Sequence, residues 1–265
     1  MKAEYSYSKD VLDKLGYSTE EFNEIKENIE KGNFAYCHKN EYDKHSIKWD
    51  KYMKSCVGGI DIPTLWCPNE DNYIEKTFLL LAQDPLRNEK YWEFCENENK
   101  RIDKIHNVII GTPYALHVDA NRSEKENRIK KSLRLNVGIY RNLIDKIVSD
   151  LHSRVYCTDI FKCFPLDKKI ETFEIGILKD EIEKVQPDFI ICMGKFAQNA
   201  MDILKDEITV FSDEKILNIP HPKARSTSWI KWRANNNIQQ NKNSFTDKDK
   251  VSDIITFLSY KIKSA

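Results

Sequence analysis

Short apolar runs alternate with amphipathic segments from residue 77 onward, and this alternation limits the possible folds most. The run TFLLLAQ (77–83) is typical of a strand buried on both faces. Further strands are expected at RVYCTDIF (154–161), PDFIICMG (187–194) and KILNIPHP (215–222). Strands that alternate with helices pair in parallel and are covered by those helices. We therefore predict a three-layer α/β/α domain with a central, mainly parallel four-stranded sheet.

The periodicity of apolar residues locates the helices around this sheet. Residues 33–75 lack such periodicity and are rich in Trp, Tyr, Asn and Pro. We expect residues 1–75 to form a helical and irregular N-terminal extension packed on the core, and residues 76–265 to form the α/β domain. A further possible strand is NVII (107–110), and helices are expected at 8–32, 134–151, 173–185, 195–205 and 248–262.

Charge and cysteine content exclude several classes of protein. The 42 basic and 42 acidic residues leave no formal net charge, which argues against coating nucleic acid with global positive charge but permits a local basic face. The seven cysteines form no CxxC pair, so we predict free thiols in the cytoplasm and no metal site. No apolar run approaches the roughly 20 residues of a membrane span.

Three of the predicted strands end on residues that can carry chemistry: Gln83-Asp84, Asp159 and His221. The carboxyl ends of parallel strands meet at one edge of a sheet, where ligands bind. Taken singly, each has a structural interpretation as a cap, a turn or a backbone hydrogen bond. Together, two carboxylates and an imidazole suit hydrolysis of a bond whose leaving group becomes an anion.

Four segments in this order resemble motifs of the uracil-DNA glycosylase superfamily. AQDPLRN (82–88) is similar to its Gly-Gln-Asp-Pro-Tyr motif, and IPHPKARS (219–226) is similar to its His-Pro-Ser loop. VYCTDIFKCFP (155–165) resembles its middle strand, and VQPDFIICMGKFAQNAM (185–201) its helix–strand–glycine–helix segment. The resemblance covers about residues 75–230. It implies a DNA glycosylase that flips a nucleotide out of the helix and leaves an abasic site.

The resemblance also implies roles for individual residues. Asp84 would stabilise the cationic sugar and orient water, and His221 would donate to the base O2. No lysine nucleophile is needed, so a monofunctional enzyme without lyase chemistry is expected. The base-binding residues would be Gln83, Leu86, Tyr114, Leu116 and Asp159, and the DNA contacts would come from Lys223, Arg225, Ser226, Ser228, Lys231 and Arg233. Trp229 and Trp232 would stack on bases or pack into the body.

Departures from the family pattern bear on the substrate. Asp159 replaces an Asn, and a carboxylate accepts from the exocyclic amine of cytosine. Leu86 replaces a tyrosine that excludes substituents at C5, and Tyr114 or Leu116 falls where the family stacks an aromatic ring. An enzyme that removed plain cytosine would destroy its own genome. We therefore expect a modified cytosine, hydroxymethylated or glucosylated, in phage DNA.

Other interpretations remain open: a uracil-DNA glycosylase of base-excision repair, a catalytically inactive DNA-binding module of the same fold, and a nucleotide-processing hydrolase. The last would lack a Gly-Lys phosphate loop. The iron–sulfur branches of the family are matched only at Cys163, because no cysteine lies near Lys179 and a cluster needs four ligands. We predict no cofactor, DNA as the partner and a monomer.

Overall fold

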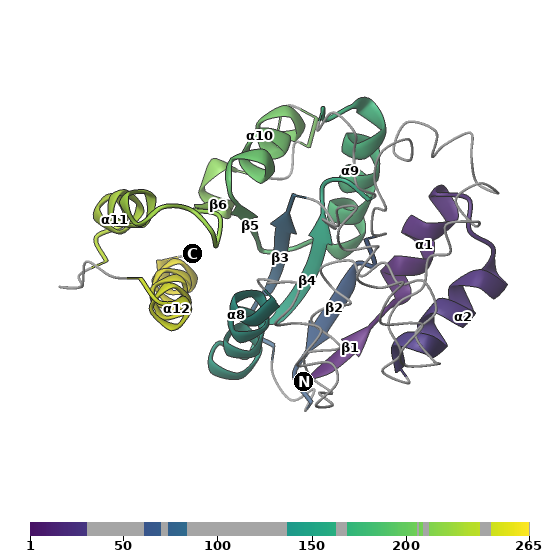
Figure 1. Ribbon diagram of the computed structural model, residues 1–265, viewed down its shortest axis with the longest axis horizontal. Helices are drawn as coiled ribbons and strands as arrows, with labels where there is room; N and C mark the ends of the chain where they lie inside the picture. The colour runs from purple at the N-terminus through teal and green to yellow at the C-terminus, as the bar shows by residue number, and fades with distance from the viewer. Residues whose placement is uncertain are drawn as a thin grey trace, which may run out of the picture.

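The computed structural model describes residues 1–30, 61–69, 74–83, 137–162, 169–205, 207–208, 212–238 and 245–264. Within them lies a six-stranded sheet in the order β1-β2-β4-β3-β5-β6 (Figure 1). The strands are β1 (Lys2–Glu4), β2 (Thr64–Cys67), β3 (Thr77–Ala82), β4 (Arg154–Asp159), β5 (Phe189–Met193) and β6 (Ile216–Ile219). The last four pair in parallel, which confirms the predicted layered α/β fold and its parallel four-stranded centre.

Helices cover both faces of this sheet. On one side lie α8 (Val137–Asp150) and α12 (Asp247–Ser264), with α11 (Ser226–Asn235) beside α12, and on the other lie α9 (Thr172–Val185) and α10 (Lys195–Leu204) (Figure 1). Side chains of β3 alternate between the two apolar cores, because successive residues of a strand point to opposite faces. Phe78 and Leu80 enter the first core, and Leu79 and Leu81 enter the second. No helix among the described residues is long and apolar enough to cross a membrane.

The N-terminal segment contributes two strands that the sequence did not predict. β2 pairs antiparallel with β4, and β1 pairs antiparallel with β2. Both strands are short, at three and four residues, and lack an alternating pattern. The sheet therefore has six strands where four were expected, and β1 and β2 of the N-terminal segment extend it. The division of the chain into domains at residue 75 stays a prediction.

Two helical predictions also differ from the structure. The single helix expected at 8–32 is two helices, α1 (Ser6–Lys14) and α2 (Thr19–Glu30). Gly16 separates them with a φ of 90°, a left-handed conformation that favours glycine. Ser18 and Glu21 then exchange backbone–side-chain hydrogen bonds of 2.7 and 3.2 Å that begin α2. Helix α11 was not predicted, and the possible strand at 107–110 lies outside the described residues.

Candidate active site at the carboxyl edge of the sheet

The parallel strands bring the predicted site residues to one edge. Ala82, the last residue of β3, lies in register with Asp159, the last residue of β4. Gln83 follows β3 and is half-buried, and its carbonyl oxygen accepts the Phe161 N–H at 3.1 Å. The next residue, Asp84, lies outside the described part of the chain, as do Leu86, Tyr114, Leu116 and Cys163. The structure thus locates the strand end that carries Asp84 without describing its side chain.

Asp159 is completely buried, and side chains hold its backbone on both sides. Its N–H donates to Asp61 Oδ2 at 2.8 Å, and its carbonyl oxygen accepts from Lys162 Nζ at 2.7 Å. Asp61 precedes β2 in the N-terminal segment, and its own N–H donates to the Lys162 carbonyl at 2.7 Å. The end of β4 is therefore fixed by a residue that lies far away in sequence.

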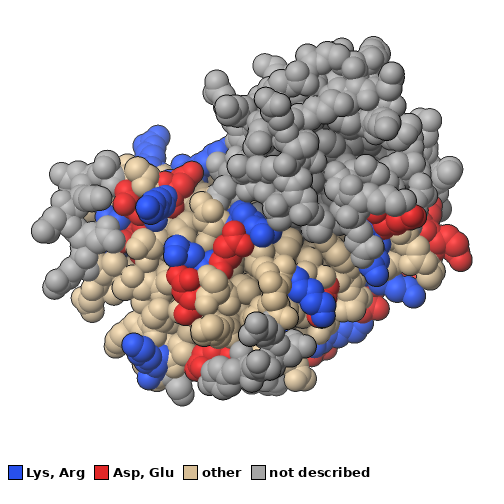
Figure 2. Space-filling model, turned by 90° about the horizontal axis from the view of Figure 1, so that it is seen from below, with Lys and Arg blue, Asp and Glu red and all other residues tan. Residues whose placement is uncertain are grey.

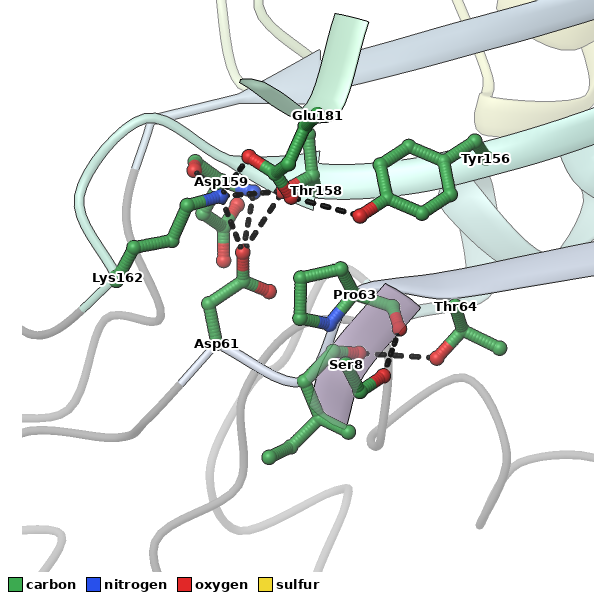
Figure 3. A network of polar contacts seen from close by, with 10 residues as sticks. Ser8, Asp61, Pro63, Thr64, Tyr156, Thr158, Asp159, Lys162 and Glu181 are labelled. Carbon is green, nitrogen blue, oxygen red and sulfur yellow. Dashed lines mark hydrogen bonds and ion pairs between the residues drawn. The ribbon is translucent and has the colours of Figure 1, made fainter. Parts of the chain in front are cut away.

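A buried polar network surrounds this point (Figure 3). The ammonium group of Lys162 lies 3.0 Å from Asp61 Oδ2 and 2.6 Å from Glu181 Oε2. Thr158 Oγ1 accepts from Lys162 Nζ and lies 2.9 and 2.7 Å from carboxylate oxygens of Asp61 and Glu181, one of which receives its single proton. The Tyr156 hydroxyl donates to Glu181 Oε1 at 2.7 Å. Three structural elements meet here: the segment before β2, the end of β4 and helix α9.

Burial and charge act in opposite directions on this network. Burial raises the pKa of Asp61 to about 6, although the charge of Lys162 partly opposes this rise. For Lys162, burial alone would lower the pKa, but the charges of Glu181 and Asp61 outweigh it, so the pKa is raised. Lys162 therefore stays an ammonium ion at neutral pH, with two carboxylates as partners.

His221 lies two residues beyond β6, at the same edge of the sheet. Its Nδ1 accepts the Lys223 N–H at 3.1 Å. A neutral imidazole that accepts at Nδ1 carries its proton on Nε2, where it can donate. Burial, together with the charges of Lys223 and Lys250, lowers the pKa of His221. The ring is thus held neutral at pH 7 with Nε2 as a hydrogen-bond donor.

The position of His221 depends on Gly194, which follows β5. The Gly194 N–H donates to the Ile219 carbonyl at 2.9 Å, so the ends of β5 and β6 lie next to each other. A Cβ atom at Gly194 would lie 2.9 Å from the Cβ of His221, and Gly194 has a φ of 91°. Both facts require glycine here. On the other side, Lys250 of α12 donates to the Pro222 carbonyl at 2.8 Å.

Most of the predicted DNA contacts are available to solvent, but one prediction needs correction. The exposed residues lie at the start of α11 and along one side of it: Lys223, Arg225, Ser226, Ser228 and Lys231. Arg233 is instead buried and forms an ion pair with Asp253 of α12. Its guanidinium group also lies 3.9 Å from the centre of the Phe245 ring. Arg233 therefore joins two helices and is not positioned to bind phosphate.

Trp229 and Trp232 belong to the first apolar core. Both are buried, and Trp232 packs edge-on against Trp229 and against Phe257 of α12. Of the two interpretations of these residues, packing into the body is the one the structure bears out.

A comparison with protein-family models matches residues 76–246 to the uracil DNA glycosylase superfamily, which is 171 of the 265 residues. The chain belongs to this superfamily. Its members are generally DNA glycosylases, which act on DNA. Comparisons with curated proteins and with solved structures gave no match.

This glycosylase-family chain combines residues from inside and outside the matched segment. Asp159, Lys162, Gly194 and His221 lie within it, whereas Asp61 precedes it. Sequence reasoning missed Asp61, because nothing near it marks a catalytic or binding role. It also missed Lys162 as a buried residue, because a lysine that follows a strand end is normally exposed. Among the described residues, no group of three His, Cys, Asp or Glu side chains could hold a metal ion.

The charge of the glycosylase-family surface agrees with the composition over the part that Figure 2 shows. On that face, basic and acidic side chains of the described residues lie side by side, and neither sign covers a continuous area. The exposed basic and hydroxyl groups from Lys223 to Lys231 therefore form a local feature next to His221.

Proposed function

We propose that this chain is a monofunctional DNA glycosylase that hydrolyses the N-glycosidic bond of a flipped-out modified cytosine and leaves an abasic site. The observation that carries the proposal is that one edge of the parallel sheet holds both a neutral His221, with Nε2 as donor, and a buried Asp159. Membership of a superfamily of DNA glycosylases supports the reaction class.

Cleavage of the N-glycosidic bond separates charge, and the site suits that separation. The departing base takes the bonding electrons and becomes an anion, while positive charge develops on the sugar. A donor at His221 Nε2 stabilises the anion as it forms, and one positioned donor contributes about 3 kcal/mol. Asp84 would stabilise the sugar cation and orient the water whose oxygen bonds to C1′. The proton from that water passes to solvent, and the base anion is protonated on release.

The choice of base rests on Asp159 and Leu86. A carboxylate at residue 159 accepts hydrogen bonds from the exocyclic amine of cytosine, whereas it repels the O4 atom of uracil. Leucine at residue 86 leaves room for a substituent at C5, such as a hydroxymethyl group or the sugar attached to it. Because host DNA contains unmodified cytosine, a requirement for this substituent protects the host genome. Phage DNA with modified cytosine is the substrate we propose, with a role in antiviral defence.

A second candidate is removal of uracil in DNA repair, which the family to which the chain belongs favours. The two functions share every step except recognition of the base. They therefore differ in what the Asp159 side chain binds, and the substrate assay below separates them.

The test is base release from three DNAs of the same sequence: one with a U·G pair, one with glucosylated hydroxymethylcytosine, and one unmodified. Abasic sites are detected by alkaline cleavage. Cutting only the modified DNA is the expected result, and cutting only at uracil would replace it with a repair function. Asp84→Ala should abolish release, whereas Asp150→Asn, on the exposed face of α8, should leave it unchanged. If wild-type protein binds all three DNAs and cuts none, it is a binding module.

A further inference from the structure

We propose that Asp61, acting with Lys162, is a positioning residue for the base-reading end of β4, so that the N-terminal segment helps to set base selectivity. This inference rests on the proposed function. It deepens that function by assigning a role to a residue outside the segment that matches the glycosylase family.

The first argument is geometric. The two groups that hold the Asp159 backbone are Asp61 Oδ2 at 2.8 Å from its nitrogen and Lys162 Nζ at 2.7 Å from its carbonyl oxygen. Asp61 and Lys162 also bind each other at 3.0 Å. The peptide groups on both sides of Asp159 are thereby tied to one buried ion pair, which restricts how the Asp159 side chain leaves the strand (Figure 3).

The second argument is the cost of the arrangement. Asp61, Lys162 and Glu181 are all buried, with side chains exposed by 0%, 1% and 4%. Buried ion pairs give little net stability compared with apolar packing, because both charges lose their hydration. An apolar group could fill the same space, but it could not accept from the Asp159 N–H or donate to its carbonyl. This network can therefore fix the backbone conformation of residue 159, and apolar side chains could not.

The third argument is location. Asp61 lies next to β2, which pairs with β4 from Thr64↔Cys157 to Trp66↔Val155. That pairing ends at Cys157, so in the part of the chain that the structure describes β2 pairs with neither Thr158 nor Asp159, the last two residues of β4. On the other edge, β3 pairs with β4 through Ala82↔Asp159. On the β2 side, the Asp61 carboxylate provides the hydrogen-bond acceptor for these two residues, with bonds to Thr158 Oγ1 and to the Asp159 N–H.

The test compares Asp61→Ala with Asp61→Asn, and uses Asp150→Asn as a control for the same change on an exposed surface. Asparagine keeps an oxygen that can accept from the Asp159 N–H, whereas alanine removes it. Selectivity is the ratio of kcat/KM on modified-cytosine DNA to that on uracil DNA. A displacement of the reading group of about 1 Å is enough to change rates by ~10²-fold. We expect Asp61→Ala to shift the ratio by about tenfold or more, and Asp61→Asn to stay within about threefold of wild type.

A general loss of structure would give a different result. It lowers the fraction of active protein, so kcat/KM on modified-cytosine DNA and on uracil DNA would fall by the same factor and their ratio would not change. An unchanged ratio in Asp61→Ala would therefore overturn the proposal, and so would failure of that variant to fold. Amide hydrogen exchange gives a readout that needs no activity. Exchange should become faster by about tenfold or more at residues 158–162 and stay unchanged at residues 189–193 of β5. Equal loss of protection in both segments would refute a local role.

Failure of the proposed function would be recognised separately. If wild-type protein releases no base from any of the DNAs, the glycosylase proposal falls. Hydrogen exchange then decides alone whether Asp61 holds the end of β4.

Discussion

Replacing Lys162 by methionine should destabilise the protein strongly, and more at high pH than at low pH. Methionine is similar to lysine in length, so the substitution removes the ammonium group and keeps most of the packing volume. It leaves the buried carboxylates of Asp61 and Glu181 without the cation that contacts both. Removing one partner of a buried ion pair costs about 3–5 kcal/mol in free energy of unfolding.

The size of the effect on melting temperature follows from the length of the chain. An unfolding entropy of about 2.1 cal/mol/K per residue gives about 0.6 kcal/mol/K for this 265-residue chain. A loss of about 3–5 kcal/mol therefore lowers Tm by about 5–9 °C. The control is Lys146→Met on α8, where the ion pair with Asp150 is exposed and contributes less than about 0.5 kcal/mol.

The dependence on pH distinguishes a charge effect from a packing effect. The pKa of Asp61 is raised in the folded protein, from 3.8 to about 6. The folded state therefore binds the Asp61 proton more tightly than the unfolded state, and the associated stability is present in acid and lost as pH rises through about 6. Without Lys162 the pKa of Asp61 rises further, because Lys162 lowers it. The difference between variant and wild type should thus be larger at pH 8 than at pH 5.

Urea unfolding followed by far-UV circular dichroism at these two pH values measures the effect. A Lys162→Met protein as stable as wild type at pH 8 would refute the reasoning. An equal loss at pH 5 and pH 8 would refute it as well, because it would point to packing and not to charge.

Four further substitutions test the site around His221 and the neighbouring helix α11. Base release should fall in acid, at a pH below the ordinary pKa of histidine, because burial and the charges of Lys223 and Lys250 lower the pKa of His221 and only the neutral imidazole accepts at Nδ1. This acid limb should be absent from the pH–rate profile of His221→Asn, whose rate should be lower by about 10²-fold. Gly194→Ala should add about 1–3 kcal/mol of backbone strain and displace His221, with a loss of base release of about tenfold or more at an unchanged Kd for DNA. Arg233→Leu should lower the free energy of unfolding by about 3 kcal/mol through loss of the Asp253 partner, with no change in the salt dependence of DNA binding. Arg225→Ala should instead leave the free energy of unfolding unchanged and reduce the slope of log Kd against log salt by about 1.

The layered fold could be predicted because its central strands carry strong local signals. β3 and β5 are continuous apolar runs, since both faces of each strand are buried. The helices between them have apolar residues at helical spacing. The carboxyl ends of these strands then follow from the rule that parallel strands end at one edge. This is why His221 and Asp159 could be placed at a shared edge from sequence alone.

What escaped prediction depends on contacts between distant segments. Asp61 meets Lys162 across 101 positions, and no local pattern near either residue marks that contact. Helix α11 was not predicted because charged and hydroxyl residues dominate its sequence and leave few apolar residues at helical spacing. Its buried side consists of Trp229, Trp232 and Arg233, and the Asp253 carboxylate on α12 balances the charge of the arginine there.

The insertion of β2 beside β4 has a consequence for how the chain folds as it is synthesised. Leu65 of β2 pairs with Tyr156 of β4, which is 91 positions later. At about 5–20 residues per second, ribosomes need roughly 5–20 s to make the intervening segment. During that interval β1 can pair with one side of β2, but β4, the strand that pairs with the other side, has not yet been made. A nascent chain with such an open strand edge is prone to associate with other chains, so the N-terminal segment is where we expect chaperones to bind during translation.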